Sequence, residues 1–163
     1  MADSTLPTHT GRPGSCGETV HPGLARNIIV ELSSGVDEWE IELHAEVDAW
    51  LLGLCTDDPD TADLVEDAID QLSQEGPTLG RPMVDRIKGS RHHKMKELRT
   101  GSKGNSEVRI LFAFDLERHA ILLVAGDKAG DWQGWYNRNI PIADRRFDEH
   151  LDQLAENDRR IER

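Results

Sequence analysis

The chain has 163 residues, of which 37% are hydrophobic and 31% are charged, and its formal net charge is −12. A chain of this length buries one ordinary hydrophobic core, so we expect one domain with tails. No apolar run approaches the roughly 20 residues that a membrane span needs, which excludes a membrane protein. The first 30 residues lack the basic and apolar segments of a secretory signal, so we expect a cytoplasmic location.

Positive charge is concentrated in one part of this acidic chain. Residues 80–140 carry 12 Lys and Arg against 7 Asp and Glu, whereas residues 1–79 carry 2 against 17. The net charge alone argues against a polyanionic partner, but a local basic surface near a Tyr and two Trp side chains favours one. We therefore predict that this region binds a polyanion.

The two ends of the chain differ from its middle. Residues 1–35 are rich in Gly and Pro and have no sustained apolar period, so they cannot bury enough apolar surface to offset the ordering of the chain. We predict a disordered leader there. The alternative is that the true start lies near Val36 and that the preceding residues come from an extended gene assignment. Residues 36–157 form the predicted domain, and residues 158–163 form a short C-terminal tail.

The first half of the domain is predicted to form a strand and two helices. Apolar and polar residues alternate over residues 39–43, which is the period of a half-buried strand. Helical spacing follows over residues 47–54. Asp58 and Pro59 then begin a second helix, as an N-cap followed by Pro at the first helical position, and Gly76 ends it. We expect the two helices to form an antiparallel hairpin.

The second half of the domain is predicted to form three strands and a helix. The strands are expected over residues 93–100, 107–115 and 120–127, and their short connections imply antiparallel neighbours. The last helix is expected over residues 143–156. The predicted fold class is therefore α+β, an antiparallel sheet covered on one face by the N-terminal helical hairpin and the C-terminal helix.

Several short segments, in this order, resemble a known protein family. They are KMKELR (94–99), VRILFAFD (108–115), LLVAGDK (122–128), WY (135–136) and IPIAD (140–144). Over residues 37–155 the chain resembles the phage-derived HigB-like branch of the RelE/HigB toxins. The resemblance implies a RelE-like fold and the toxin of a type II toxin–antitoxin pair, which cleaves messenger RNA in the ribosomal decoding site. It also implies a cognate helix-turn-helix antitoxin as partner.

RNA cleavage can be derived as a chemical problem without the family. A metal-free reaction requires a base for the ribose 2′-hydroxyl, cations that stabilise the crowded phosphate and a proton for the leaving oxygen. Lys, Arg, His and Tyr side chains suit these roles. The chain shows no spacing of carboxylates and His that marks a metal cage. We therefore expect a metal-independent site without a cofactor.

Arg109 is the first candidate catalytic residue. It lies within a predicted strand whose apolar residues alternate, so that it points to the face opposite them. We expect its guanidinium to contact the phosphate. By analogy with a lost oxyanion donor, its contribution is roughly two to three orders of magnitude in rate. The alternative is a sheet-edge Arg that pairs with Asp115 or Glu97.

The strand predicted over residues 93–100 supplies further basic candidates. Alternation places Lys94 and Lys96 on one face with His92, and Arg99 and His93 on the other. The resemblance implies that basic residues of this strand bind RNA and transfer protons. We therefore predict catalytic roles for the two lysines and RNA binding for the other three. A one-residue change of register exchanges the two faces, and the alternative for each residue is an ordinary solvated position.

The segment after the last predicted strand completes the candidate set. The resemblance implies a catalytic or phosphate-binding cation at Lys128 and a base or stacking residue at Tyr136. Tyr136 acts as a base only if nearby cations lower its pKa from about 10. Trp135 and Arg138 are predicted to bind RNA. For Trp135 and Trp132, core packing or antitoxin contact is an equally open alternative to base stacking.

These candidates combine into one geometric prediction. The following five residues are expected to converge on one phosphate of messenger RNA: Lys94, Lys96, Arg109, Lys128 and Tyr136. The alternative function is a non-nuclease RelE-fold protein, either a gyrase-directed toxin or a DNA-binding co-repressor. A third alternative is a decayed phage remnant that still folds but has no further function.

Overall fold

The computed structural model describes residues 27–28, 38–101 and 103–163. The predicted leader over residues 1–35 lies outside this part of the chain, apart from Asn27 and Ile28. No helix in the described ranges combines the length and the apolar character needed to cross a membrane.

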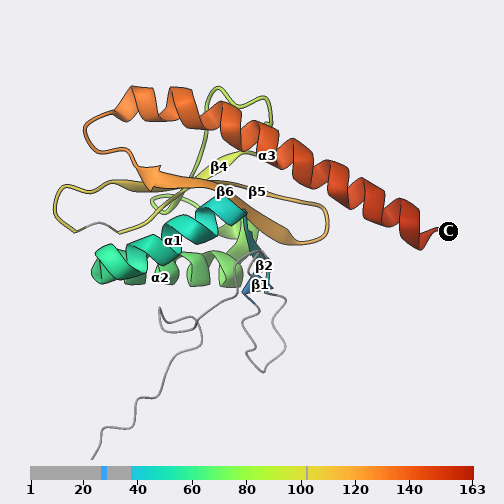
Figure 1. The fold of residues 1–163 in the computed structure, drawn as a ribbon, viewed down its shortest axis with the longest axis horizontal. Helices are drawn as coiled ribbons and strands as arrows, with labels where there is room; N and C mark the ends of the chain where they lie inside the picture. The colour runs from blue at the N-terminus through green and yellow to red at the C-terminus, as the bar shows by residue number, and fades with distance from the viewer. Residues whose placement is uncertain (1–26, 29–37, 102) are drawn as a thin grey trace, which may run out of the picture.

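A mixed sheet forms the centre of the molecule (Figure 1). Within the described residues its strand order is β1-β2-β6-β5-β4-β3. The strands are β1 (Asn27–Ile28), β2 (Glu40–Leu43), β3 (Val84–Arg86), β4 (Lys96–Arg99), β5 (Val108–Phe114) and β6 (His119–Asp127). All neighbours are antiparallel except β2 and β6, which are parallel. The prediction of an entirely antiparallel sheet is therefore wrong for this one pair. The antiparallel series from β3 to β6 ends with β6 running in the same direction as its neighbour β2.

The N-terminal helical hairpin forms as predicted, from α1 (Ala45–Asp57) and α2 (Pro59–Glu75). The Asp58 carboxylate caps α2 by accepting a hydrogen bond from the Thr61 backbone N–H at 3.2 Å. The chain leaves α2 at Gly76, whose φ of +56° favours glycine. A 3₁₀ turn over Gly76–Thr78 then leads to β3.

The helices cover both faces of the sheet, which corrects the predicted one-sided arrangement (Figure 1). Buried residues of α1 and α2 pack with Ile110 and Phe112 of β5, whereas α3 (Trp132–Ile161) packs on Leu111 and Ala113 of the same strand. Successive residues of a strand point to opposite faces, so β5 serves both cores. Its nearly continuous apolar sequence reflects this burial on two sides.

Helix α3 is longer than its predicted range of 143–156. It begins at Trp132 and contains Pro141. Proline removes a helical hydrogen bond and is disfavoured inside helices, which is why the sequence predicted a start beyond it. The additional turns before Pro141 lie against the sheet, where Trp135 and Ile140 join the second core. Strand β3 was also missed, because it lies in a segment that was interpreted as a Gly- and Pro-rich linker.

Candidate functional site

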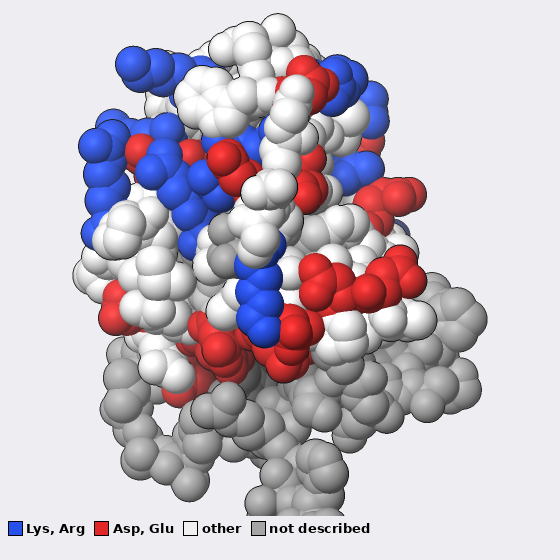
Figure 2. Space-filling view, turned by 90° about the vertical axis from the view of Figure 1, so that its left-hand side faces the viewer, with Lys and Arg blue, Asp and Glu red and all other residues white. Residues whose placement is uncertain are grey.

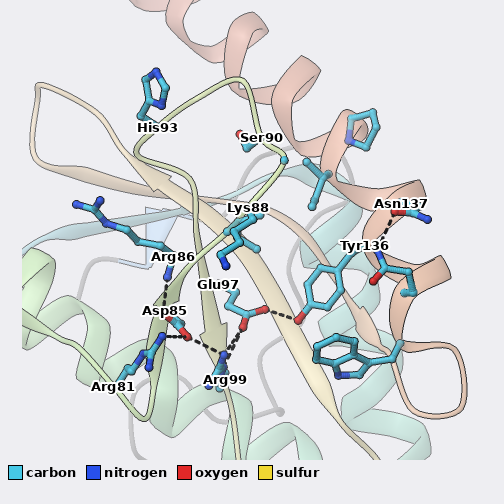
Figure 3. A pocket seen from close by; sticks show the side chains of 16 residues that line it. Arg81, Asp85, Arg86, Lys88, Ser90, His93, Glu97, Arg99, Tyr136 and Asn137 are labelled. Atoms are coloured by element: carbon cyan, nitrogen blue, oxygen red, sulfur yellow. Dashed lines mark hydrogen bonds and ion pairs between the residues drawn. The ribbon is translucent and has the colours of Figure 1, made fainter.

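A pocket of 1190 Å³ lies between the β3–β4 edge of the sheet and the first turns of α3 (Figure 3). Its charged lining consists of Arg81, Asp85, Arg86, Lys88, Glu97 and Arg99. Residues of α3, including Trp132, Gln133, Tyr136 and Asn137, form the facing wall. Basic side chains outnumber carboxylates around the opening, so the pocket suits an anionic ligand.

Charge is separated on the surface of the protein. Residues 38–79, which contain the helical hairpin, include no Lys or Arg. Figure 2 shows Lys and Arg gathered mainly in the upper half of one face, with Asp and Glu dominant in the lower half. The basic segment recognised in the sequence therefore forms a distinct surface on the folded molecule.

Glu97 of β4 lies at the centre of the pocket and is only 5% exposed. Tyr136 donates its hydroxyl hydrogen to Glu97 Oε2 at 2.5 Å, and Arg99 Nε donates to Oε1 at 2.9 Å (Figure 3). Burial and the Glu97 hydrogen bond raise the pKa of Tyr136 well above its usual value, against an opposing effect of Arg109. Tyr136 is thus held protonated. The predicted lowering of its pKa by surrounding cations is wrong, and a role as proton donor fits it better than a role as base.

A chain of ion pairs extends from Glu97 to the edge strand β3. Arg99 contacts Glu97 at 2.8 Å and Asp85 at 2.9 Å, and Asp85 contacts Arg81 at 3.0 Å. The hydrogen bond from Arg81 lowers the pKa of Asp85. The hydrogen bond to Glu97, opposed by burial, raises the pKa of Arg99. Asp85 and Arg99 therefore stay charged at neutral pH, and Arg99 is oriented from two sides.

Arg109 projects from β5 toward the α3 face, as its alternation predicted. It pairs across the sheet with Arg99, and Nη1 donates to the Val108 carbonyl at 2.8 Å. Its Nε is buried without a hydrogen-bond partner in the described part of the chain. Such an unpaired donor costs about 1–3 kcal/mol, which a bound anion offsets. Among the described ion pairs none joins Arg109 to Asp115 or Glu97, which removes the alternative of a structural pair.

Lys128 lies behind the aromatic wall of the pocket and not in its opening. Its side chain is 3% exposed, and Nζ contacts Glu107 Oε2 at 3.1 Å. The ammonium also lies 4.2 Å from the ring centroid of Trp132 and 5.7 Å from that of Tyr136. Lys128 therefore supports both rings through cation–π contacts. It does not face the space where a phosphate would bind.

Lys94 and Lys96 do not join the cluster around Tyr136. Lys94 is exposed in a turn before β4. Lys96 pairs with Phe112 in the sheet and lies 5.4 Å from the ring of Phe114, on the face of the helical hairpin. Strand β4 begins only at Lys96, and its register places Glu97 and Arg99 on the face that α3 covers. Of the five residues predicted to converge, Arg109 and Tyr136 remain as candidates for contact with the phosphate, Lys128 lies behind the ring of Tyr136, and the roles of all three remain predictions.

The two predicted RNA-binding histidines lie in different environments. His93 is exposed and lines the pocket (Figure 3). His92 Nε2 lies 2.8 Å from Asp148 Oδ1, and its ring packs edge-on against Phe147 of α3. His93 is therefore available to a ligand, whereas His92 fixes the loop that carries its neighbour.

That loop, which joins β3 to β4, is fastened to α3 by a second carboxylate. Ser90 Oγ donates to Asp144 Oδ1 at 2.5 Å, and the Arg91 backbone N–H donates to Oδ2 at 3.2 Å. Asp144 is only 6% exposed. This attachment holds Lys88 at the rim of the pocket (Figure 3).

Trp135 and Arg138 lie outside the pocket, contrary to their predicted RNA-binding roles. Trp135 is 6% exposed and covers Gly126, where an added Cβ would lie 2.9 Å from its Nε1. Its ring is part of the second core and leaves no face for a base. Arg138 is exposed and pairs with Asp131 at 2.7 Å. The core-packing alternative applies to Trp135, whereas Trp132 is 60% exposed at the pocket.

The described residues contain no cluster of three or more His, Cys, Asp or Glu arranged to hold a metal ion. Sequence reasoning missed Glu97 and Asp85 as pocket residues. The available signal for Glu97 was that it follows Lys96 directly and interrupts the alternation of basic and apolar residues over residues 94–99. Asp85 had no such signal, because β3 has three residues and shows no measurable period.

Comparison with known proteins identifies the family. Residues 54–148 match the family described as "Phage derived protein Gp49-like". The chain belongs to this Gp49-like family. It is 56% identical over 139 residues to "Putative toxin HigB2" of Mycobacterium tuberculosis, a match that covers 85% of this chain and 66% of that relative. It is 51% identical over 109 residues to "Putative toxin HigB3" of the same organism, covering 67% of this chain and 90% of the relative.

These matches confirm the predicted resemblance of this Gp49-like protein to HigB-like toxins, and they support its assignment as the toxin of a toxin–antitoxin pair. The chain spans about two thirds of the first relative's length. No solved structure matches the chain significantly.

Proposed function

We propose that this Gp49-like toxin is a metal-independent endoribonuclease that cleaves translated messenger RNA, in the ribosome and in the cytoplasm. The observation that carries the proposal is the buried Glu97 carboxylate, which is hydrogen-bonded to Tyr136 and Arg99 inside a basic pocket. This arrangement offers a proton acceptor, a proton donor and fixed cations within one space. Those are the groups that metal-free RNA cleavage requires.

In the proposed reaction Glu97 gains and then loses one proton, and Tyr136 loses and then regains one. Glu97 accepts the proton of the ribose 2′-hydroxyl, and the 2′-oxygen forms a bond to phosphorus. The bond from phosphorus to the 5′-oxygen breaks, and Tyr136 donates its proton to that oxygen. The products are a 2′,3′-cyclic phosphate and a 5′-hydroxyl. Glu97 then returns the proton to Tyr136 through their 2.5 Å hydrogen bond, which restores both groups.

The cations of the site act on the phosphate in this scheme. Arg109, which acts on Tyr136 but does not line the pocket, has a buried Nε with no partner among the described residues, and Arg99 is held in place by Glu97 and Asp85. Fixed donors of this kind stabilise developing charge because they need no reorganisation during the reaction. Lys128 contributes indirectly, by holding the ring of Tyr136.

The decisive experiment combines growth with RNA mapping. Induction of the protein is expected to stop growth, and RNA ends are expected to lie within translated codons. Purified protein should generate the same ends in the presence of EDTA, with added ribosomes as the arm that tests ribosome dependence. The neighbouring gene should encode a helix-turn-helix protein that binds the toxin and blocks its activity.

Growth arrest with intact RNA would contradict the nuclease proposal. It would favour the alternative of a non-nuclease RelE-fold protein, such as a gyrase-directed toxin or a DNA-binding co-repressor. A matched assay of DNA supercoiling in the same cells separates the gyrase-directed toxin from the co-repressor.

A further inference from the structure

Trp132 is an exposed aromatic side chain at the edge of a charged pocket. It is the first residue of α3, lines the pocket and remains 60% exposed. Water contact with a large indole ring is unfavourable. An exposed ring that is also held in a fixed orientation is therefore a candidate contact for a flat ligand.

The orientation of this ring is fixed from behind. The Lys128 ammonium lies 4.2 Å from the ring centroid, and Glu107 holds that ammonium by a 3.1 Å ion pair. Tyr136 packs edge-on against Trp132 with 5.7 Å between the ring centroids. A buried cation and an aromatic edge thus support the indole. The 60% exposure shows that these contacts leave much of the ring open to solvent.

Two amide side chains lie beside the ring on the same helix. Gln133 and Asn137 both line the pocket, and Gln133 Nε2 donates to Asn137 Oδ1 at 3.1 Å. In the described part of the chain this contact leaves Gln133 Oε1 as an open acceptor and Asn137 Nδ2 as an open donor. An adjacent acceptor and donor match the hydrogen-bonding edge of a nucleobase.

We propose that Trp132, Gln133 and Asn137 form a nucleobase-binding subsite for single-stranded RNA. The base stacks on Trp132, and the amide pair contacts its edge. The basic rim formed by Arg81, Arg86 and Lys88 binds the adjoining phosphates. An aromatic platform beside a basic groove is the usual design of single-stranded nucleic acid binding. This subsite deepens the proposed function and rests on it for the identity of the ligand.

The subsite also implies a role for Lys128 that differs from the predicted catalytic or phosphate-binding role. Lys128 acts as a positioning residue, because its ammonium contacts the rings of Trp132 and Tyr136 and not the open pocket. Loss of its charge should loosen both rings. The effect on RNA binding is expected to be smaller than that of removing the indole itself.

The test measures binding and not cleavage. The full chain carrying E97Q, which keeps RNA intact, is titrated with a fluorescently labelled single-stranded RNA of mixed sequence. Adding W132A should weaken binding roughly 10- to 100-fold, the range expected for loss of one stacked base. W132F should retain most of the affinity for RNA. K128M should have an affinity between those of W132A and W132F. L116A is the matched control, since Leu116 is 91% exposed but does not line the pocket.

An abasic nucleotide, moved stepwise along the RNA, tests the stacking partner directly. At one position the abasic nucleotide should abolish the difference in RNA affinity between the E97Q protein and the protein that carries both E97Q and W132A. Circular dichroism confirms that each variant is folded. Homopolymer RNAs test the amides: Q133A and N137A should change the order of affinities among the four bases, and an unchanged order would remove them from the subsite.

Equal RNA affinity with and without W132A would overturn the proposal. Loss of antitoxin binding by W132A, with RNA affinity unchanged, would also overturn it and would assign Trp132 to a protein interface. A protein that does not bind RNA at all would remove both the subsite and the endoribonuclease. Trp132-dependent binding by a protein that never cleaves RNA would retain the subsite and remove only the nuclease activity.

Discussion

Two buried carboxylates on the α3 side of the sheet have different surroundings. Asp115 receives contacts at 2.9 Å from His119 Nδ1, His150 Nε2 and the backbone N–H groups of Glu117 and His119. Its side chain is 0% exposed, and it does not line the pocket. The Glu97 side chain is 6% exposed and contacts Arg99 and Tyr136, but it opens onto the 1190 Å³ pocket. Burial alone therefore does not mark a functional carboxylate. An adjoining cavity distinguishes it.

The largest expected effect comes from the matched substitutions E97Q and D115N. E97Q should reduce RNA cleavage by about 100- to 10,000-fold, because it removes the proposed base. Its stability should change by about 1 kcal/mol or less, since Arg99 is partly exposed and keeps its contact with Asp85. D115N should cleave RNA at the wild-type rate under conditions where it is folded. Cleavage assays on both proteins test this difference, and an equal loss of cleavage activity in E97Q and D115N would contradict it.

Arg109 provides the next largest effect. R109M should reduce cleavage by roughly 100- to 1000-fold, because the guanidinium is proposed to stabilise the phosphate. Its melting temperature should stay the same or rise, since the substitution removes a buried Nε that has no hydrogen-bond partner among the residues that the structure describes. R138M is the control, because Arg138 is an exposed basic residue that pairs with Asp131. Full activity of R109M would remove Arg109 from the site.

Asp115 should affect stability and not chemistry. D115N should lower the free energy of unfolding by about 3 kcal/mol, because it removes the buried carboxylate that His119 and His150 contact. Urea denaturation measures this loss. A D115N protein as stable as the wild type would show that the closed cluster does not hold the fold together.

The smallest expected effect is a pH dependence of stability from His119. Burial lowers its pKa, but the hydrogen bond with Asp115 and the charges of Asp115 and Glu40 exceed this and raise it above 6.5. Its stabilising contribution is therefore complete below pH 6.5 and is lost as the pH rises through the higher folded value. The pKa of Asp115 is lowered, despite burial, by its His150 and His119 hydrogen bonds, so this carboxylate stays ionised throughout that range.

Urea denaturation at about pH 5.5 and about pH 8.5 measures this effect. The wild type should lose about 1 kcal/mol or less across this range, because Glu40 is largely exposed. H119Q should show a flatter profile. Parallel profiles for the two proteins would exclude His119 as the cause.

Local patterns in the sequence predicted most of the secondary structure and part of the site. The face of Arg109 was predicted correctly, because it is the polar residue between Val108 and Ile110 in a strand of seven residues, and successive strand residues point to opposite faces. Strand β4 has four residues, so its register was open to a shift, and Glu97 occupies the position in the site that was predicted for Lys96. The contact of Glu97 with Tyr136 joins residues 39 positions apart, and no local pattern contains it. Pro141 hid the first turns of α3, because its usual effect is to end a helix.

The position of α3 after β6 has a consequence for synthesis. The pocket's other walls come from residues 81–99, but Tyr136 and the facing wall belong to α3. A ribosome that makes this protein therefore completes β3 and β4 before it makes the residues that close the pocket. Tyr136 reaches Glu97 only after β5 and β6 have been made and α3 has docked on the sheet. The order of the elements thus delays the formation of the complete pocket until the sheet has been made.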